Sequence, residues 1–404
     1  MKFLSHLKNK DLANQTCLLR VDFNLTDDDL KKQKIPLRIK SVLPTIKFLI
    51  KKRAKVVILS HRGRPEKVSS IKYQVSNHTL KPFVKIISKI LKNPVHFIDF
   101  DKKTNFVKTE DVQKIRASIN GSIFILENLR FLPGEDKNDA NLAKRLAGLG
   151  TFYVNDAFAF SHRKDASMVA ITKFLPSYAG LLLEKEIKNL SQVMNPFDKT
   201  QGSRRVYRGV KKPKQPLVII LGGVKVSDKI GVIKNFLKGQ GSRVNCFLTG
   251  GGVANTFFAA QGLPVGKSLY EKEMIPAARQ LLKSRKIILP IDSAIQGKKI
   301  LDIGPKTIKR YVEIIKKART IVWNGPMGYI ESPKFARGSK AISQAILKSQ
   351  AFSVIGGGET ISILPAACFK PHASRLFVST AGGAMLEYLA GKKLPGIEAL
   401  NTSL

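Results

Sequence analysis

Residues 217–229 read LVIILGGVKVSDK, which is a run of five apolar residues, two glycines and then a more polar segment. Val and Ile favour strands, and a strand that is apolar at every position is typical of a parallel sheet covered on both faces. Paired glycines mark a turn. The order of strand, turn and helical stretch predicts one repeating unit of an α/β fold.

The same order recurs along the chain. Nine more short β-rich runs lie at 17–23, 55–60, 123–126, 152–155, 246–249, 286–290, 320–323, 351–355 and 376–378. Amphipathic helical patterns lie between several of them, for example at 42–52 and 141–149. Ten strands are too many for one comfortable sheet, and 404 residues suggest two or three domains. We predict two α/β lobes, each a doubly wound, Rossmann-like parallel sheet.

The predicted boundary between the lobes, 1–183 and 217–385, lies at residues 184–216. Residues 184–193 have helical periodicity, which the sequence NPFD at 195–198 breaks. Residues 201–216 carry six positive charges and no negative one. We interpret 184–216 as a hinge helix followed by a basic linker, with a polyanion-binding arm as the alternative for the basic part. Residues 386–404 are expected to return to the N-terminal lobe.

Composition and charge narrow the class of protein. Hydrophobic residues make up 43% of the chain, which excludes wholesale disorder. Lys and Arg number 70 against 29 Asp and Glu, a formal net charge of +41. Such a field attracts polyanions, so phosphorylated metabolites are expected as ligands and weak, non-specific nucleic-acid binding is predicted.

The cysteines and the apolar stretches point to a cytoplasmic protein without a membrane span. Cys17, Cys246 and Cys368 are far apart, lack zinc-ligand spacing and are expected to be buried free thiols. Lysines interrupt the N-terminus before an apolar signal-peptide region can form. The charge-free stretch 244–266 is long enough to span a bilayer, but its Gly, Asn, Thr and Gln content predicts a strand, a glycine turn and a helix.

Cationic side chains gather after the strands of the first half. In open parallel sheets ligands bind at the carboxyl ends of strands, and Arg presents a rigid fork of donors to phosphate or carboxylate. The segments concerned are RVDFN at 20–24, Arg38, SHRGRP at 60–65, ENLRF at 127–131 and HR at 162–163. Together they predict a basin for an anionic substrate.

Glycine clusters follow the strands of the second half. They lie at 222–223, 250–252, 325–328, 356–358 and 382–383. Glycine allows the backbone to approach a ligand closely, and a following helix N-terminus offers free N–H groups to phosphate. This half is therefore predicted to bind a nucleotide. Residues 262–268, GLPVGKS, have three residues rather than four between the glycines and are rejected as a P-loop.

Taken together and in order, these segments resemble the phosphoglycerate kinase family. The resemblance rests on the segments above and on VNDAF at 154–158, LLLEKEI at 181–187, GGVKVSDKIGVI at 222–233, VWNGPMG at 322–328, GGGET at 356–360 and LPGIEAL at 394–400. It covers nearly the whole chain. It implies a bilobed, typically monomeric kinase that exchanges a phosphoryl group between ATP and 3-phosphoglycerate, with Mg²⁺ as cofactor and 1,3-bisphosphoglycerate and ADP as the other pair.

The resemblance also implies roles for individual residues. It assigns 3-phosphoglycerate binding to Asp22, Asn24, Arg38, His61, Arg64, Arg130 and Arg163. It assigns nucleotide binding to Lys225, Lys229, Gly250, Gly251, Asn324, Glu331, Gly357, Gly358, Glu359 and Thr360, with Glu359 as the metal contact. Because the attacking carboxylate is already ionised, no general base is needed. Arg38, Lys225 and the N–H groups near Gly382 and Gly383 are the candidates to stabilise the transferring phosphoryl group.

Several positions depart from the family pattern. Glu359 stands where the family has Asp, and Ala381 and Met385 replace a glycine and a serine of TGGGAS. If position 381 needs a positive φ, alanine is strained there. The segment 159–161, AFS, replaces GTA, and the basic 199–215 segment exceeds the family's short connection. These departures leave two alternatives open: a degenerate relative that only binds nucleotide or nucleic acid, and a transferase acting on another small acid.

Overall fold

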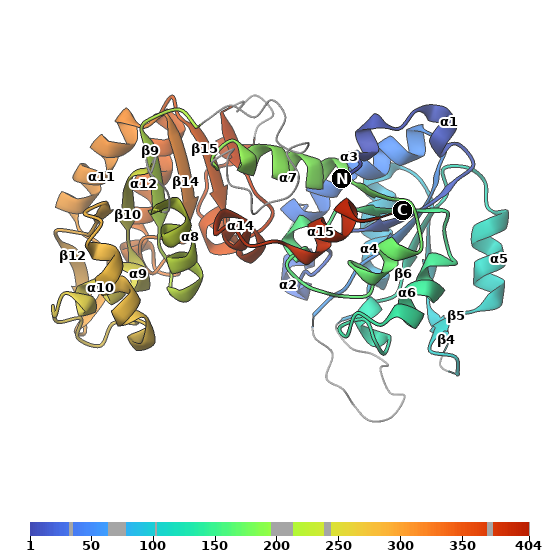
Figure 1. Cartoon of the computed structure of the whole chain (residues 1–404), viewed down its shortest axis with the longest axis horizontal. Coiled ribbons are helices and arrows are strands. Elements are labelled where there is room, and N and C mark those ends of the chain that lie inside the picture. The colour runs from blue at the N-terminus through green and yellow to red at the C-terminus, as the bar shows by residue number, and fades with distance from the viewer. Residues whose placement is uncertain are drawn as a thin grey trace. The chain divides into compact units, whose positions relative to one another are not determined.

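A computed structural model describes residues 1–31, 35–63, 78–101, 103–194, 213–237, 244–369 and 375–403 (Figure 1). The chain forms two compact units. Unit 1 comprises Met1–Glu186 and Leu394–Leu404, and unit 2 comprises Ile187–Lys393. Each unit contains one six-stranded parallel sheet, so the predicted α/β class with two doubly wound sheets is confirmed.

The sheet of unit 1 places the loops after β1 and β7 at a change in strand order. Its order is β3 (Val95–Ile98), β6 (Ile123–Leu126), β2 (Lys55–Leu59), β1 (Thr16–Arg20), β7 (Phe152–Asn155) and β8 (Ser177–Ala179). From β1 the chain moves to β2 on one side, and from β7 it moves to β8 on the other. Ligands of open parallel sheets bind at such switch points, beyond the carboxyl ends of the strands.

One core of unit 1 lies between this sheet and two helices. Cys17 and Leu19 of β1 and Val56 and Ile58 of β2 share a buried cluster with residues of α3 (Leu37–Lys51) and α4 (Lys81–Leu91). Alternate side chains of a strand point to opposite faces. Leu18 and Val57 are fully buried outside this cluster, so the sheet is covered on both faces, as its uniformly apolar strands predict.

Unit 2 repeats the arrangement. Its order is β11 (Ile287–Ile288), β10 (Val244–Thr249), β9 (Leu217–Leu221), β14 (Thr320–Asn324), β15 (Phe352–Gly356) and β16 (Leu376–Val378). The connections β9–β10 and β14–β15 run in opposite directions across the sheet. Right-handed crossovers therefore put α8 (Ser227–Leu237) and α12 (Arg337–Lys348) on opposite faces. The switch point lies between β9 and β14.

The remaining elements are short or peripheral. The helices are α1 (Asn9–Leu12), α2 (Asp27–Lys31), α5 (Thr109–Ala117), α6 (Ala140–Ala147), α9 (Gly251–Ala260), α10 (Ile275–Leu282), α11 (Pro305–Lys317), α13 (Gly358–Ser362), α14 (Gly383–Leu389) and α15 (Pro395–Asn401). Two hairpins pair β4 (Phe100–Asp101) with β5 (Phe106–Val107) and β12 (Ser293–Gln296) with β13 (Lys299–Ile303). The sequence did not predict β3, β8 or the hairpins, because these strands are short or partly polar.

The helix at the boundary, α7 (Leu181–Ser191), begins three residues before the predicted 184–193 and ends two residues earlier. Its start is fixed by the buried Asp156, whose Oδ1 accepts hydrogen bonds from the backbone N–H groups of Leu182 at 2.9 Å and Leu183 at 3.1 Å. A carboxylate at a helix N-terminus satisfies free donors and complements the helix dipole. The division between the units falls within α7. Residues 195–212, with most of the basic segment, lie outside the described residues.

The chain returns to unit 1 at Leu394 rather than at the expected residue 386. Helix α14 belongs to unit 2, where it packs against α8 and has buried residues such as Leu386 and Leu389. Asn235 of α8 also donates from Nδ2 to the carbonyl oxygen of Leu389 at 2.8 Å. The helix that lies in unit 1 is α15, and Asn155 Nδ2 donates to the carbonyl oxygen of Gly396 at 3.1 Å.

Other predictions from the sequence hold. Cys17, Cys246 and Cys368 are buried thiols without disulfides. Residues 244–266 fold into β10, a glycine turn and α9, and no helix in the described part of the chain is long and apolar enough to cross a membrane. The rejected P-loop, 262–268, follows a helix rather than a strand.

Candidate active site

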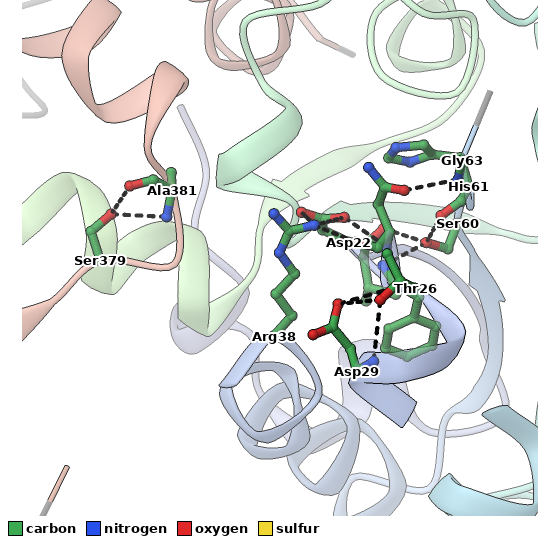
Figure 2. Close-up of polar contacts among 12 residues, drawn as sticks. Asp22, Thr26, Asp29, Arg38, Ser60, His61, Gly63, Ser379 and Ala381 are labelled. Atoms are coloured by element: carbon green, nitrogen blue, oxygen red, sulfur yellow. Dashed lines mark hydrogen bonds and ion pairs between the residues drawn. The ribbon is translucent and has the colours of Figure 1, made fainter. Parts of the chain in front are cut away.

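Arg38 lies in the first turn of α3 and points toward the loop after β1 (Figure 2). Its Nη1 donates to the carbonyl oxygen of Asn24 at 2.6 Å and lies 3.3 Å from Asp22 Oδ2. No hydrogen bond joins its Nε or Nη2 to another described residue. The side chain is 35% exposed. Arg38 is thus anchored through one nitrogen and keeps further donors for a ligand.

Asp22 and Asn24 fix the shape of the loop after β1. Asn24 N donates to Asp22 Oδ1 at 3.0 Å, and Asn24 Oδ1 accepts from the backbone N–H of Gly63 at 2.8 Å. Ser60 joins the same two loops, because its Oγ accepts from Phe23 N and donates to the carbonyl oxygen of Val21, both at 2.9 Å (Figure 2). The loops after β1 and β2 therefore form one hydrogen-bonded unit beside Arg38.

His61 is buried and neutral in this setting. Arg20 Nη2 lies 3.2 Å from His61 Nδ1. Since a guanidinium can only donate, Nδ1 is assigned as the acceptor and the ring proton belongs on Nε2. Burial, and then the cations of Arg20 and Arg130, hold the pKa of His61 well below its usual value. A neutral ring with Nε2–H can donate to an anion without a proton transfer.

Arg130 and Arg163 both lie against the Phe160 ring. Their Cζ atoms are 5.5 Å and 5.4 Å from its centroid. Arg130 Nη2 is 3.8 Å from the buried Asp165 carboxylate, whereas its buried Nε has no hydrogen-bond partner among the described residues. A buried donor without a partner costs about 1–3 kcal/mol. An anionic ligand would satisfy it.

Two arginines of the predicted basin are used by the fold itself. Arg20 is fully buried and donates to Ser167 Oγ and to the carbonyl oxygen of Val21. Arg62 is also buried, and its guanidinium donates to two backbone carbonyls and to Asp27. These side chains position the loops rather than face a ligand. The predicted substrate residue Arg64 lies outside the described residues.

In unit 2 three glycine loops pack against one another at the switch point. The backbone N–H of Gly223 donates to the carbonyl oxygen of Pro326 at 2.8 Å, and that of Gly251 to Met327 at 2.9 Å. A Cβ on Gly325 would come within 2.1 Å of the carbonyl oxygen of Gly222, and φ at Gly325 is +91°. These glycines are required for close backbone contact, and not only for ligand access.

The glycines after β15 and β16 are more open. A Cβ on Gly358 or Gly383 would meet nothing within 4 Å, and both residues are exposed. A Cβ on Gly382 would lie 3.3 Å from Cα of Gly357, so the two loops approach each other closely. The predicted phosphate contacts at Gly357, Gly358, Gly382 and Gly383 thus come together on one side of unit 2.

Lys225 and Lys229 follow the Gly222–Gly223 turn and differ in burial. Lys225 is exposed, whereas Lys229 of α8 is 7% exposed. Burial lowers the pKa of Lys229, and the carboxylates of Asp228 and Glu359 oppose this shift. The exposed Glu359 lies beside the same turn, since a Cβ on Gly223 would come within 4.0 Å of its Oε2. The predicted cations and the predicted metal contact are therefore neighbours.

Other predicted nucleotide residues have structural partners. Asn324 is buried and donates from Nδ2 to the carbonyl oxygen of Gly356 at 3.0 Å. Thr360 is buried, and its Oγ1 accepts from Gly325 N at 2.8 Å. Both side chains join the loop after β14 to the loop after β15. Gly250 lies at the carboxyl end of β10, and Glu331 is exposed in the turn after residue 328.

The departures at positions 381 and 385 are accommodated. Ala381 is not among the residues with positive φ, so the strain that the sequence raised as a concern is absent. Its N–H donates to Ser379 Oγ at 3.2 Å (Figure 2). The Met385 side chain fills the space beside Gly356, where a Cβ would lie 2.4 Å from Met385 Sδ.

The described residues contain no cluster of three or more His, Cys, Asp or Glu side chains that could hold a metal ion by themselves. Mg²⁺ is usually bound through one or two carboxylates together with substrate phosphates. The exposed Glu359 carboxylate, next to two lysines and open glycine loops, fits such an arrangement. It does not fit a metal held by the protein alone.

Sequence reasoning missed three residues of these sites. Glu271 accepts from Val226 N at 2.8 Å and Ser227 N at 2.9 Å, and so fixes the start of α8 near Lys229. Asp165 and Phe160 contact the arginines of unit 1. Glu271 lies 44 residues or more from its partners, and no local pattern reports such a contact. For Phe160 the sequence offered one signal, which is the segment AFS at 159–161 in place of the family's GTA.

Comparison with known proteins agrees with this geometry. The family model described as "Phosphoglycerate kinase" matches residues 7–392. The phosphoglycerate kinase of Pseudothermotoga lettingae is 40% identical over 420 residues, covering 98% of both chains, and that of Francisella philomiragia is 38% identical over 425 residues, covering 99% of this chain and 98% of the relative.

Two solved structures agree with the same assignment. Phosphoglycerate kinase from Coxiella burnetii matches with a TM-score of 0.76 and 35% identity, over 98% of both chains. The enzyme from Pyrococcus horikoshii matches with a TM-score of 0.79 and 32% identity, over 99% of this chain and 98% of that one. The matches extend over both units and all the loops described above, and on this evidence the chain belongs to the phosphoglycerate kinase family.

Proposed function

We propose that this chain is an active phosphoglycerate kinase, which reversibly transfers a phosphoryl group between ATP and 3-phosphoglycerate. The observation that carries the proposal is a set of donors in unit 1 that have no hydrogen-bond partner among the described residues. These are Nε and Nη2 of Arg38, Nε of Arg130 and, as assigned above, Nε2–H of His61. A chain kept only to bind nucleotide would not need them.

The proposed mechanism relies on positioning and charge. The attacking carboxylate of 3-phosphoglycerate is ionised at neutral pH, so the protein need not remove a proton. Arg38 in unit 1 and Lys225 in unit 2 would offset the negative charge of the transferring phosphoryl group, together with the N–H groups of Gly382 and Gly383. Asp22, Asn24, Arg64, Arg130 and Arg163 would hold the acid. Because the substrates would bind to different units, transfer requires the units to bring them together and exclude water.

The nucleotide would be held by the glycine loops of unit 2. Gly250, Gly251, Gly357 and Gly358 would allow the nucleotide to approach the protein backbone closely. Lys229 would supply positive charge. Asn324 and Thr360 would hold the loops in place, and Glu331 is proposed as a peripheral contact. Glu359 would bind Mg²⁺ with the phosphates, and the metal would neutralise charge on them.

A coupled assay with ATP, Mg²⁺ and 3-phosphoglycerate tests the proposal. Turnover supports it. ATP binding without turnover would favour the degenerate relative, and turnover with another small phosphorylated acid but not with 3-phosphoglycerate would favour the different transferase. We also propose that the protein acts as a cytoplasmic monomer, as is typical of the family. Weak binding of nucleic acid by the basic segment remains a prediction.

Glu359→Asp is expected to preserve or raise turnover at limiting Mg²⁺. The shorter side chain restores the family's residue and moves the carboxylate oxygens toward the octahedral geometry that Mg²⁺ demands, with ligands at about 2.0–2.1 Å. A titration of the rate against Mg²⁺ measures this. The control is Glu313→Asp, which shortens an exposed glutamate side chain on α11 in the same way. A large loss of Mg²⁺-dependent activity in Glu359→Asp alone would mean that the backbone has adapted to Glu359.

The KM for 3-phosphoglycerate is expected to rise with ionic strength, while kcat changes much less. The formal charge of +41 raises the local concentration of anionic substrates. Salt screens this field, since the Debye length falls from about 30 Å at 0.01 M to about 8 Å at 0.15 M. Initial rates in a series of potassium chloride concentrations separate KM from kcat. A kcat that falls as steeply as KM rises would contradict an effect limited to association.

A further inference from the structure

The ring of Phe160 is the centre of the cationic cluster in unit 1. Three guanidinium groups lie against it, with Cζ-to-centroid distances of 5.2 Å for Arg20, 5.5 Å for Arg130 and 5.4 Å for Arg163. All three are within the range of about 6 Å in which an aromatic ring attracts a cation. The His61 ring lies at 4.0 Å with a tilt of 38°. Phe160 itself is buried, at 7% exposure.

Few carboxylates balance this cluster. The Oδ2 atom of Asp165 lies 3.8 Å from Arg130 Nη2, which is too far for a hydrogen bond, and has no hydrogen-bond partner among the described residues. Glu135 is a second carboxylate near the arginines, and it accepts from Ser167 N at 3.0 Å and Ser167 Oγ at 2.5 Å. Burial raises the pKa of Glu135 to about 7, so at neutral pH it carries only part of its charge. The three positive charges around the ring therefore exceed the negative charge of Asp165 and Glu135 together.

We propose that Phe160 is a positioning residue for the acid substrate, which holds Arg130 and Arg163 at the site without neutralising their charge. The inference rests on the proposed function. A carboxylate in place of Phe160 could also hold two guanidinium groups, but it would offset one of their two charges and repel an incoming phosphate. A ring face attracts cations through its quadrupole and adds no net charge. The arginines can thus be ordered before the ligand arrives and remain available to it.

The contact of the His61 ring with Phe160 extends this role. Because Nδ1 of His61 faces Arg20 and one side of its ring faces Phe160, the direction of Nε2–H is restricted. Loss of the ring would free His61 and the two arginines together. Preorganisation lowers the cost of ordering side chains on binding, so the loss should appear in the affinity for the acid.

Steady-state kinetics of Phe160→Leu and Phe160→Tyr test the proposal. Leucine keeps an apolar side chain without a ring, and tyrosine keeps the ring. We expect Phe160→Leu to raise the KM for 3-phosphoglycerate about tenfold, with the KM for ATP within about twofold of the wild type, and Phe160→Tyr to retain most of the affinity. Phe152→Leu, which removes another buried ring of unit 1, is the control and should leave both KM values unchanged.

A second measurement does not depend on turnover. Protons of a guanidinium group above a ring face have resonances shifted by the ring current. In NMR spectra of the full chain without ligand, the Nε–Hε signals of Arg130 and Arg163 should lose this shift in Phe160→Leu and keep it in Phe160→Tyr. Unchanged arginine signals in the folded Phe160→Leu variant would overturn the proposal.

The outcomes separate this inference from the proposed function. If the wild type does not turn over 3-phosphoglycerate, the proposed function fails, and the NMR comparison still decides whether the ring orders the arginines. If the wild type is active and Phe160→Leu keeps its KM for 3-phosphoglycerate, the positioning role fails and the proposed function stands. A tenfold rise in KM that Phe160→Tyr also shows would mean that side-chain shape, and not the ring face, matters, and this too would overturn the proposal.

Discussion

Arg38→Ala is expected to lower kcat by about 10²–10³, the usual cost of removing one donor that stabilises charge in a transition state. The KM for ATP should remain close to that of the wild type, because Arg38 belongs to unit 1 and the proposed nucleotide residues belong to unit 2. The reason for a large effect is the anchoring of Arg38 through Nη1 alone, at 2.6 Å from the carbonyl oxygen of Asn24. Its other nitrogens can follow the charge of the transferring group.

Two further variants make the Arg38 experiment specific. Arg38→Lys keeps the charge but loses the planar fork, and we expect it to be intermediate between the wild type and Arg38→Ala. Arg116→Ala removes one positive charge from an exposed position on α5 of the same unit and should be nearly silent. Thermal unfolding of each variant checks that the loss of the partner of Asp22 has not unfolded the loop. Near-normal kcat in Arg38→Ala would remove Arg38 from the proposed mechanism.

The sequence predicts the central strands well because both faces of each are buried. In β9 every residue is both buried and apolar, so an uninterrupted apolar run reports the strand directly, and in β14 the buried Ile-Val-Trp at 321–323 does the same. Strand β8 is different, since it is only three residues long and its central Tyr178 is half-buried. Edge strands have only one neighbouring strand and their faces are covered less completely, so fewer of their side chains need to be apolar. Short edge strands leave little trace in the sequence.

The start of α7 shows a second limit. The helical periodicity from 184 onward is visible in the sequence, but the first turn is set by Asp156, 26 residues before Leu182. The same holds for α8, whose start depends on Glu271. Helix boundaries fixed by side chains from distant segments cannot be read from local patterns, whereas the existence of the helix can.

Residue type at the ends of strands predicts the region of a site better than the role of each side chain. Arg20, Arg62 and Arg38 look alike in the sequence. In the structure the first two are buried and bonded to the protein, and Arg38 keeps donors for a ligand. The difference depends on which carbonyl groups and carboxylates lie opposite each guanidinium. The glycines show the same limit, since Gly222 and Gly325 are needed for loop packing while Gly358 and Gly383 face open space.

Lys225→Ala is expected to lower kcat by about 10²–10³, with the KM for 3-phosphoglycerate nearly unchanged. Lys225 is the exposed cation after the Gly222–Gly223 turn, beside the buried Lys229 and near Glu359. An exposed ammonium without a hydrogen bond to another described residue can move to meet phosphate oxygens. Lys229 is less suitable for this test, because removing a buried lysine among carboxylates would also disturb the fold.

Lys234→Ala is the matched control for Lys225→Ala. Lys234 is exposed near the end of α8, the helix that follows Lys225, and its removal changes the net charge by the same amount. The chain has 70 Lys and Arg residues, so deleting one distant cation alters the long-range field only slightly. A large loss of kcat in Lys225→Ala but not in Lys234→Ala must therefore be local to the phosphoryl group. Equal effects in the two variants would assign the loss to the general field and exclude Lys225 as a catalytic residue.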